Sequence, residues 1–283
     1  MKSNNKKLTI EKKGLQPKYL VLSHFALLII ATLTMTINHI GTFFFQDNID
    51  LVLALYSIGR VAFPLYAFMA VQGVYKSSNN LEYSLRLLGL GILIDIVMTV
   101  SGYGYNGNAM FELGLGVLAL SLFNRKGGYS LLGIIPSAIM VMSDFDSFPI
   151  RSEYGTYGLV LMVGFYFAEK FGEEYIDYYA NLTKIDKDYL VRSSLRKYQN
   201  IFAVIFLVII SILFSVLALL YPNAFYVSRL MIIHVQDYAL FAAIFIFLYS
   251  GKQGIHNIGT QTFFYLYYPI HLLLLYYLAT SLL

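Results

Sequence analysis

The sequence predicts an all-α fold, a polytopic membrane bundle of about nine helices that each cross a lipid bilayer. Three observations support this fold class. Hydrophobic residues make up 58% of the chain and charged residues 13%, which is about half of the charged share found in soluble domains. The apolar residues gather in runs close to the ~20 residues that a helix needs to cross a bilayer. Polar strings rich in turn-forming residues separate these runs.

The candidate spans divide the chain into a short tail and one membrane domain. The spans are residues 19–44, 51–73, 83–100, 109–123, 129–142, 154–171, 199–221, 234–250 and 262–282. Because no small-residue cleavage site closes the first apolar run, we expect a retained helix and no signal peptide. The predicted organisation is a basic cytoplasmic tail at 1–18 and a transmembrane domain at 19–283. A cytoplasmic loop at 169–198 is expected to include helix at the membrane surface.

The basic residues predict the orientation of the spans. With the N-terminus in the cytoplasm, 17 of the 20 Lys and Arg residues fall in cytoplasmic segments. This bias is the one that the positive-inside rule describes. Only Arg151 and Arg229 fall outside, and Arg60 lies within a span. We therefore expect a multi-pass membrane protein with its N-terminus in the cytoplasm and its C-terminus outside.

The charge pattern and the cysteine count exclude several classes of function. The net charge of +4 does not indicate a nucleic-acid partner, because the basic residues lie in loops between apolar runs. The chain has no cysteine, so disulfides, thiolate nucleophiles and cysteine-ligated metals are excluded. The spacing of the histidines gives no support for a metal site, and we expect none.

Several ionisable residues lie where the bilayer is expected, and such residues usually face the interior of a bundle or a watery cavity. The predicted topology places most of them in the outer half of the membrane: His39, Arg60, Asp95, Glu112, His234, Asp237 and His271. For Glu112, His234 and Asp237, an interfacial role at a helix end fits equally well. Arg60 and Asp95 have the alternative of a purely structural ion pair.

Two prolines point to a cavity at the same depth. Pro64 leaves the carbonyl of Arg60 without its helical donor, and Pro269 does the same for Tyr265, just before His271. Kinked helices with polar side chains at the bend commonly line cavities. A cavity that holds histidine, arginine and carboxylates suits acid/base chemistry on an anionic or acyl substrate.

The order of these motifs resembles the TraX family, named for the pilin acetylation protein of F-type conjugation. The resemblance covers about residues 38–275 and rests on three strings, which are Asn38-His39-Ile40-Gly41, Ile58 to Phe68 (IGRVAFPLYAF) and Phe263 to Leu272 (FFYLYYPIHL). Two positions depart from the family pattern, because Asn38 and Gln72 stand where the family usually has acids. An asparagine can orient an imidazole but cannot stabilise imidazolium as a carboxylate would.

The resemblance implies an acetyltransferase, within a broader superfamily of membrane acyltransferases. Acetyl-CoA in the cytoplasm would donate an acetyl group to an amino or hydroxyl group of a peptide, a pilin N-terminus or a glycan. His39 would be the general base, and Arg60 would bind the pantetheine or stabilise the oxyanion. Asp95 or Glu112 would orient one of these two side chains. His271 would be a second acid/base or acceptor-binding group.

Further residues are expected to support this site or to bind the CoA phosphates. The supporting residues are Asn38, Pro64 and Tyr268. The phosphate-binding residues, beside Arg60, are Arg86, Arg125, Lys126 and Lys252. Two other functions stay open at this point. One is a proton-coupled transporter of small solutes or lipids that uses the same polar cavity. The other is a scaffold or immunity-type membrane protein with a degenerate site.

Overall fold

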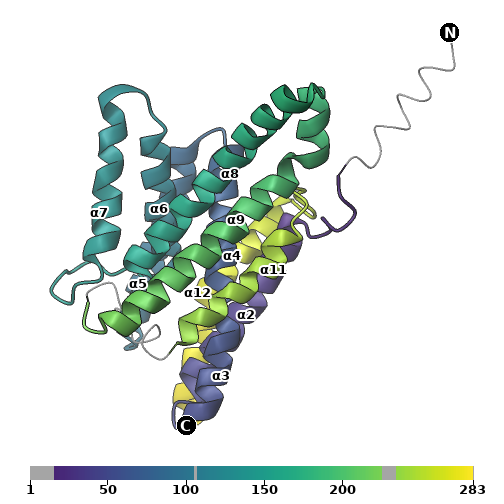
Figure 1. Cartoon of the computed structure of the whole chain (residues 1–283). Coiled ribbons are helices and arrows are strands. Elements are labelled where there is room, and N and C mark those ends of the chain that lie inside the picture. The colour runs from purple at the N-terminus through teal and green to yellow at the C-terminus, as the bar shows by residue number, and fades with distance from the viewer. Residues whose placement is uncertain (1–15, 105–106, 225–233, 283) are drawn as a thin grey trace.

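The computed structural model describes residues 16–104, 107–224 and 234–282, and over these residues the chain forms a bundle of helices without a β-sheet (Figure 1). The helices are α2 (His24–Phe44), α3 (Ile49–Gly59), α4 (Ala62–Lys76), α5 (Asn80–Val100), α6 (Ala109–Phe123), η1 (Gly127–Gly133), α7 (Ile134–Met142), α8 (Gly155–Thr183), α9 (Lys187–Leu220), η2 (Val235–Phe241), α11 (Ala242–Phe247) and α12 (Ile258–Leu282). The predicted all-α fold is confirmed.

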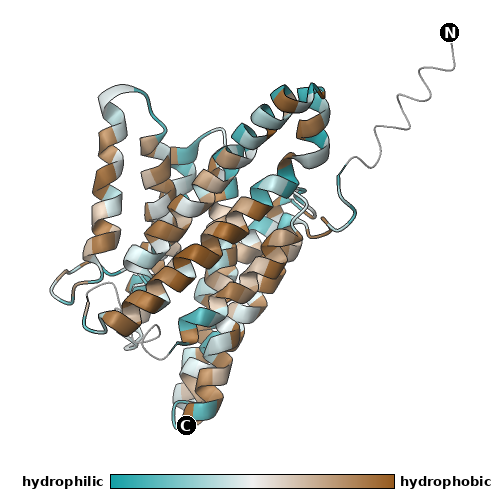
Figure 2. Ribbon diagram, in the orientation of Figure 1, coloured by the Kyte–Doolittle hydropathy of each residue, from teal (hydrophilic) through white to brown (hydrophobic). Residues whose placement is uncertain are grey.

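The composition of the helices identifies a multi-pass membrane protein. Within the described ranges, five stretches are long and apolar enough to cross a membrane: His24–Phe44, Ile49–Lys76, Asn80–Val100, Lys187–Leu220 and Ile258–Leu282. Shorter apolar helices cover Ala109–Phe123, Gly127–Met142 and Val235–Phe247. The ribbon coloured by hydropathy shows long hydrophobic stretches along the helices (Figure 2). Large apolar side chains are also exposed on the bundle, as Ile92, Leu93 and Ile96 are on α5. Lipid can cover such a surface, and water cannot do so favourably.

The second predicted span is two helices. α3 ends at Gly59 and α4 begins at Ala62, so the chain breaks its helix at Arg60 and Val61. Pro64 therefore lies in the first turn of α4, where its missing N–H is tolerated, and not inside a kinked helix. The break places the side chain of Arg60 at the junction of the two helices, near the middle of the bundle.

The predicted loop at 169–198 is mostly helical, because α8 and α9 both extend beyond their apolar parts. α8 ends at Thr183, and Lys184 follows in a left-handed conformation with φ +57°. Asp186 then caps α9 by accepting from the N–H of Tyr189 at 2.8 Å. The two helices thus form a long hairpin (Figure 1), and a separate helix lying on the membrane surface is not observed there.

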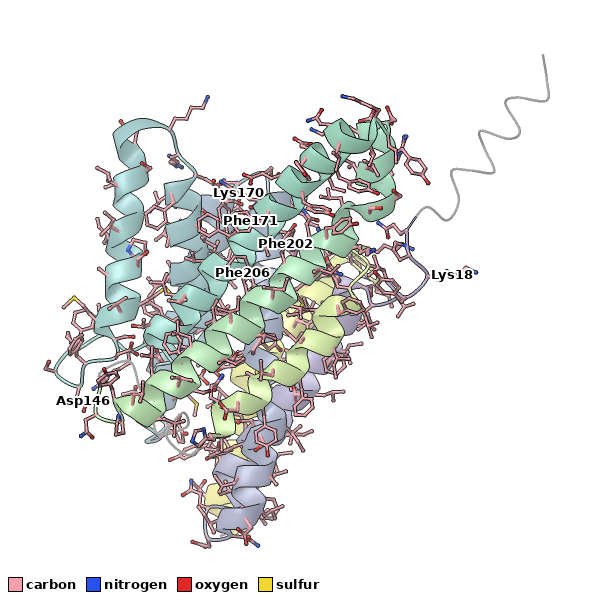
Figure 3. The ribbon with its side chains drawn as sticks, in the orientation of Figure 1. Lys18, Asp146, Lys170, Phe171, Phe202 and Phe206 are labelled. Atoms are coloured by element: carbon pink, nitrogen blue, oxygen red, sulfur yellow. The ribbon has the colours of Figure 1, made fainter. Side chains whose placement is uncertain are left out.

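Aromatic side chains hold this hairpin together. The ring of Phe171 on α8 lies 6.0 Å from Phe202 and 5.8 Å from Phe206, both on α9 (Figure 3). Further along the hairpin, the rings of Tyr175 and Tyr198 lie 4.4 Å apart. Each such ring removes a large apolar area from solvent and fixes the spacing of the helices.

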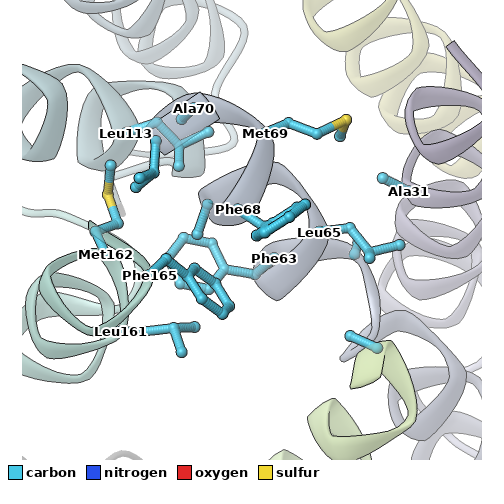
Figure 4. Packing of buried hydrophobic residues seen from close by; sticks show 14 of the residues in the cluster. Ala31, Phe63, Leu65, Phe68, Met69, Ala70, Leu113, Leu161, Met162 and Phe165 are labelled. Atoms are coloured by element: carbon cyan, nitrogen blue, oxygen red, sulfur yellow. The ribbon is translucent and has the colours of Figure 1, made fainter. Parts of the chain in front are cut away.

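Helix α4 is the centre of the core. Leu65, Phe68 and Val71 on α4 are fully buried, and Phe68 packs edge to face against Phe165 of α8 at 5.5 Å. Side chains from α2, α6 and α8 surround α4 (Figure 4). Because α4 is fixed on all these sides, the position of Arg60 immediately before it is fixed as well.

The start of α2 is joined to the segment that precedes α12. The N–H of Leu22 donates to the carbonyl of Leu248 at 3.0 Å, and the N–H of His24 donates to the carbonyl of Lys252 at 2.8 Å. In the opposite direction, the N–H of Ser250 donates to the carbonyl of Leu22 at 2.8 Å. These bonds satisfy backbone groups that precede a helix and place α2 beside α12.

Reporter fusions test the predicted orientation. Among the described residues, three apolar segments follow the turn between α8 and α9, which are α9 itself, η2 with α11, and α12. We therefore expect a reporter inserted near Asn181 to be cytoplasmic and one fused after Leu283 to be extracytoplasmic. Paired fusions to a periplasm-active and a cytoplasm-active enzyme measure this. Two reporters on the same side would mean that an even number of crossings separates them.

Candidate active site

A small cavity lies at the junction of α3 and α4. Its volume is about 20 Å³, enough for about one water molecule. The lining residues come from five parts of the described chain: Met35, Asn38, His39, Gly59, Arg60, Ala62, Phe63, Tyr66, Ala109, Glu153, Tyr154 and Tyr268. Four predicted site residues thus share one cavity, namely Asn38, His39, Arg60 and Tyr268.

His39 forms a direct contact with His271. The Nδ1 atom of His39 lies 2.8 Å from the Nε2 atom of His271, within hydrogen-bond distance. The second nitrogen of His271, Nδ1, lies 2.8 Å from the backbone carbonyl of Tyr267. The ring of Tyr268 packs edge to face against both histidines, at 6.1 and 5.6 Å. The packing of α12 on α2 therefore unites two histidines that are far apart in the sequence.

Arg60 is buried, with 4% of its surface exposed. Its direct contacts are neutral side chains, and the carboxylate of Glu153, which lines the same cavity, interacts with it electrostatically. Its Nη2 atom donates to the side-chain oxygen of Asn38 at 2.6 Å, and its guanidinium lies 5.9 Å from the centre of the Tyr154 ring. The Nε atom is buried without a hydrogen-bond acceptor among the described residues. Gly59 permits this arrangement, because a Cβ atom there would lie 2.3 Å from Cβ of Asn38.

Arg60 and Asp95 do not form the ion pair that was considered from the sequence. Among the described residues, no carboxylate lies within 4 Å of the Arg60 guanidinium. Asp95 is partly exposed on α5 and interacts instead with the side chain of Asn108. Because Asp95 does not line the cavity, the structure gives it no direct contact with His39 or Arg60.

Glu112 caps a neighbouring helix. It is fully buried, and its Oε2 atom accepts from the backbone N–H groups of Tyr154 and Gly155, at 3.2 and 3.1 Å. These N–H groups belong to the start of α8, where a carboxylate also interacts favourably with the helix dipole. Asp144 accepts from the N–H of Thr156 in the same turn, at 2.9 Å. Glu112 therefore acts on the cavity only through the placement of Tyr154.

His234 and Asp237, which were also predicted to lie in the outer half of the membrane, form a separate group. His234 Nδ1 lies 3.1 Å from Asp237, and the hydroxyl of Ser215 donates to the other oxygen of the same carboxylate. Neither His234 nor Asp237 lines the small cavity. Within the described part of the chain, no group of three or more His, Cys, Asp or Glu residues is placed to hold a metal ion.

A second cavity of about 400 Å³ lies beside the first. It is lined by α2, α4, α5, α6 and the chain from Gln253 into α12. Tyr66 lines both cavities and separates them, with its hydroxyl 2.8 Å from that of Thr32. The two cavities thus meet at one side chain.

The large cavity contains one of the expected phosphate-binding residues and several that sequence reasoning missed. Arg86 lines it, whereas Arg125, Lys126 and Lys252 do not. The residues missed are His24, Lys76 and His256. The available signal was position, since Lys76 ends the second span on the same predicted side of the membrane as Arg86.

The Lys76 ammonium is held by neutral groups. Its Nζ atom donates to the Tyr249 hydroxyl at 3.1 Å and to the Gly251 carbonyl at 3.3 Å. The nearby carboxylate of Glu169 is occupied by Arg196, which donates to both of its oxygens at 2.9 and 3.2 Å. Lys76 therefore brings an uncompensated positive charge to the rim of the large cavity.

Comparison with known proteins places the chain in a family. The TraX protein family matches residues 23–226, a range that contains Asn38, His39 and Arg60 and stops before α12 and His271. A fimbrial assembly protein of Dichelobacter nodosus, named "Probable fimbrial assembly protein FimC, serogroup H1", is 24% identical over 268 residues, which are 89% of this chain and 94% of that protein. No solved structure matches the chain. Because the family match covers most of the sequence, the chain belongs to the TraX family.

Proposed function

We propose that the protein is an acyltransferase of the bacterial cytoplasmic membrane that moves an acetyl group from acetyl-CoA to an amino or hydroxyl group. One observation carries this proposal. His39 and a buried Arg60 with an unsatisfied Nε share a small cavity, and that cavity meets a larger one at Tyr66. Acyl transfer from a thioester needs such a base and such a cation in one dry site.

The chemistry follows from the groups in the small cavity. His39 removes the proton of the acceptor as its nitrogen or oxygen attacks the thioester carbonyl carbon. The N–H groups of Arg60 then donate to the oxygen, which becomes negatively charged in the tetrahedral intermediate. When the C–S bond breaks, the proton held by His39 passes to the departing CoA thiolate. The base is thereby restored, and no metal is needed.

The large cavity is suited to the donor. Its volume of about 400 Å³ lies in the range of small-molecule sites, and its apolar walls fit a pantetheine arm. Lys76 and Arg86 at the cavity would attract the phosphate groups of CoA. A thioester that extends past Tyr66 would reach His39 and Arg60.

The acceptor would reach the small cavity from the other side. Glu153 lines that cavity and is itself exposed, so it lies at a route that does not pass the donor cavity. The name of the Dichelobacter nodosus relative refers to fimbrial assembly. This favours a pilin-type peptide as the first acceptor to be tested.

Transfer by the purified protein tests the proposal. The protein in lipid nanodiscs is mixed with acetyl-CoA labelled in its acetyl group and with pilin-type peptides or surface glycans. Mass spectrometry of surface peptides and glycans from cells with and without the protein then identifies the natural acceptor. Labelled product supports the proposal. Solute flux in proteoliposomes without CoA, with no acetyl transfer, would instead indicate a transporter.

Removing the charge of Lys76 should weaken the binding of acetyl-CoA. We expect Lys76→Gln to raise KM for acetyl-CoA about tenfold, which corresponds to about 1.4 kcal/mol, with little change in kcat. Glutamine keeps the length and hydrogen-bonding capacity of the side chain, so the packing against Tyr249 should survive. Lys126→Gln is the matched control, because Lys126 is exposed and lines neither cavity. Equal effects of the two variants would place the CoA phosphates elsewhere.

A further inference from the structure

The two histidines form a hydrogen-bond chain whose direction is fixed at one end. That end is the backbone carbonyl of Tyr267, 2.8 Å from Nδ1 of His271. A carbonyl oxygen only accepts hydrogen bonds, so Nδ1 of His271 must carry a proton and donate. In a neutral imidazole, the other nitrogen is then a bare acceptor. Nε2 of His271 is therefore the accepting end of its contact with His39.

This direction determines the tautomer of His39. Because Nε2 of His271 accepts, Nδ1 of His39, at 2.8 Å, must donate to it. Nε2 of a neutral His39 then holds a lone pair and no proton. This nitrogen has no hydrogen-bond partner among the described residues, and His39 lines the small cavity together with Arg60. The basic atom is thus available to a molecule in that cavity.

The surrounding contacts hold the chain in place. The Tyr267 ring stacks on the ring of His271, with centroids 4.8 Å apart and planes inclined by 14°. The Tyr267 hydroxyl lies 2.8 Å from the hydroxyl of Thr36 on α2. The same residue therefore supplies the carbonyl that orients His271 and a bond that ties α12 to the helix of His39.

We propose that His271 is a positioning residue, which acts through His39 by fixing Nε2 of His39 as the general base. The tautomer of His39 is inferred from the hydrogen-bond chain, and its effect on the reaction rests on the proposed acyl transfer. His271 does not pass protons onward, because the chain ends at a carbonyl that cannot take one. When His39 gains a proton from the acceptor, neutral His271 keeps accepting the hydrogen bond from Nδ1 of His39, which holds the ring in place as the carboxylate of a catalytic triad does but without a compensating charge.

The tautomer can be measured without any activity. The protein has five histidines, so ¹⁵N-histidine NMR in nanodiscs, with each signal assigned by single substitution, resolves each ring nitrogen. We expect both His39 and His271 to carry their proton on Nδ1. A His39 with its proton on Nε2 would overturn the proposal. This readout stands even if no acetyl transfer is found, so it separates failure of this inference from failure of the proposed function.

Two substitutions of His271 test the positioning role. In His271→Gln, the amide oxygen can replace Nε2 as the acceptor for His39, whereas His271→Phe removes the acceptor and keeps a ring. We expect His271→Phe to lower kcat about 10²-fold, with KM for acetyl-CoA unchanged and with His39 losing its single tautomer. In His271→Gln, His39 should keep the wild-type tautomer, and kcat should recover to near the wild-type value.

Two results would contradict the positioning role. One is full turnover by His271→Phe, and the other is a loss in both variants with the tautomer of His39 intact in each. His234→Gln is the control, because His234 lies outside both cavities. If His271→Phe does not fold, the glutamine variant still decides the question. A His39 tautomer that differs from wild type in a folded His271→Gln would then overturn the proposal.

Discussion

His39→Ala is expected to lower the rate of acetyl transfer about 10²–10⁴-fold, the usual contribution of a general base. The substitution removes the base that the described residues place beside Arg60 in the small cavity. The side chain lines a cavity and is only partly buried, so its removal should leave the folded yield nearly unchanged. Initial rates with labelled acetyl-CoA, together with gel filtration of the purified variant, measure both quantities.

The control for this experiment is His234→Ala. His234 is an imidazole at the same predicted side of the membrane, but it pairs with Asp237 and lines neither cavity. Its substitution should leave turnover near the wild-type rate. A His39→Ala protein that keeps most of its turnover would remove His39 from the mechanism, whatever the outcome for His271.

Arg60→Met is expected to abolish transfer without unfolding the protein. A buried ion pair broken on one side would cost roughly 3–5 kcal/mol, but no carboxylate lies within 4 Å of the Arg60 guanidinium among the described residues. Glu153, the carboxylate that shares its cavity, is exposed, so the loss of Arg60 leaves no buried charge unpaired. The substitution eliminates a buried charge, so the melting temperature should stay level or rise. Loss of the donor to the oxyanion should lower kcat by about 10²–10³-fold or more. Thermal unfolding in detergent and initial rates provide the two readouts.

Arg60→Lys refines this prediction. Lysine keeps the charge but loses the planar arrangement of N–H groups that contacts Asn38 and leaves Nε free, so only weak activity is expected. Arg192→Met is the matched control, since Arg192 is exposed on α9. A sharply lowered melting temperature in Arg60→Met, with full activity in Arg60→Lys, would show a structural role for the charge.

The sequence was sufficient to locate the helices, because bilayer crossing imposes long apolar runs that are visible without an alignment. The ends of the helices were harder to predict. The apolar run of α8 stops near Phe171, yet the helix continues to Thr183, because packing against α9 stabilises a polar extension. The break at Arg60 was missed for the opposite reason. Residues 51–73 are mostly apolar, with Ser57, Arg60 and Gln72 as isolated polar positions, and this run predicts one helix with an irregularity only at Pro64.

The sequence predicted the depth of the candidate-site residues in the bilayer, but not which of their side chains contact one another. Position along a span gives the depth of a side chain in the bilayer, and His39, Arg60 and His271 do meet. The rotation of each helix about its axis decides which neighbours touch, and this depends on packing. The partner of Arg60 is therefore Asn38 and not Asp95.

Glu112 shows a second limit of sequence reasoning. A carboxylate at the start of an apolar helix is expected either to cap that helix or to face a site. Glu112 instead caps α8, whose first residues follow it by more than forty positions, and only the fold brings these groups together. For the same reason Lys76 escaped notice, because its cavity is formed by α2, α4, α5 and α12 jointly.

The bonds between the start of α2 and the segment before α12 have a consequence for biogenesis. Ser250 contacts Leu22 across 228 positions of sequence, so the backbone partners of the start of α2 are synthesised long after α2 itself. The contact between His39 and His271 likewise forms only after His271 has been synthesised. Insertion of the early spans can proceed one by one, but the proposed reaction centre is assembled only when α12 has entered the membrane. A chain released early is consequently a membrane-inserted polypeptide without its histidine pair, and synthesis yields either a whole centre or none.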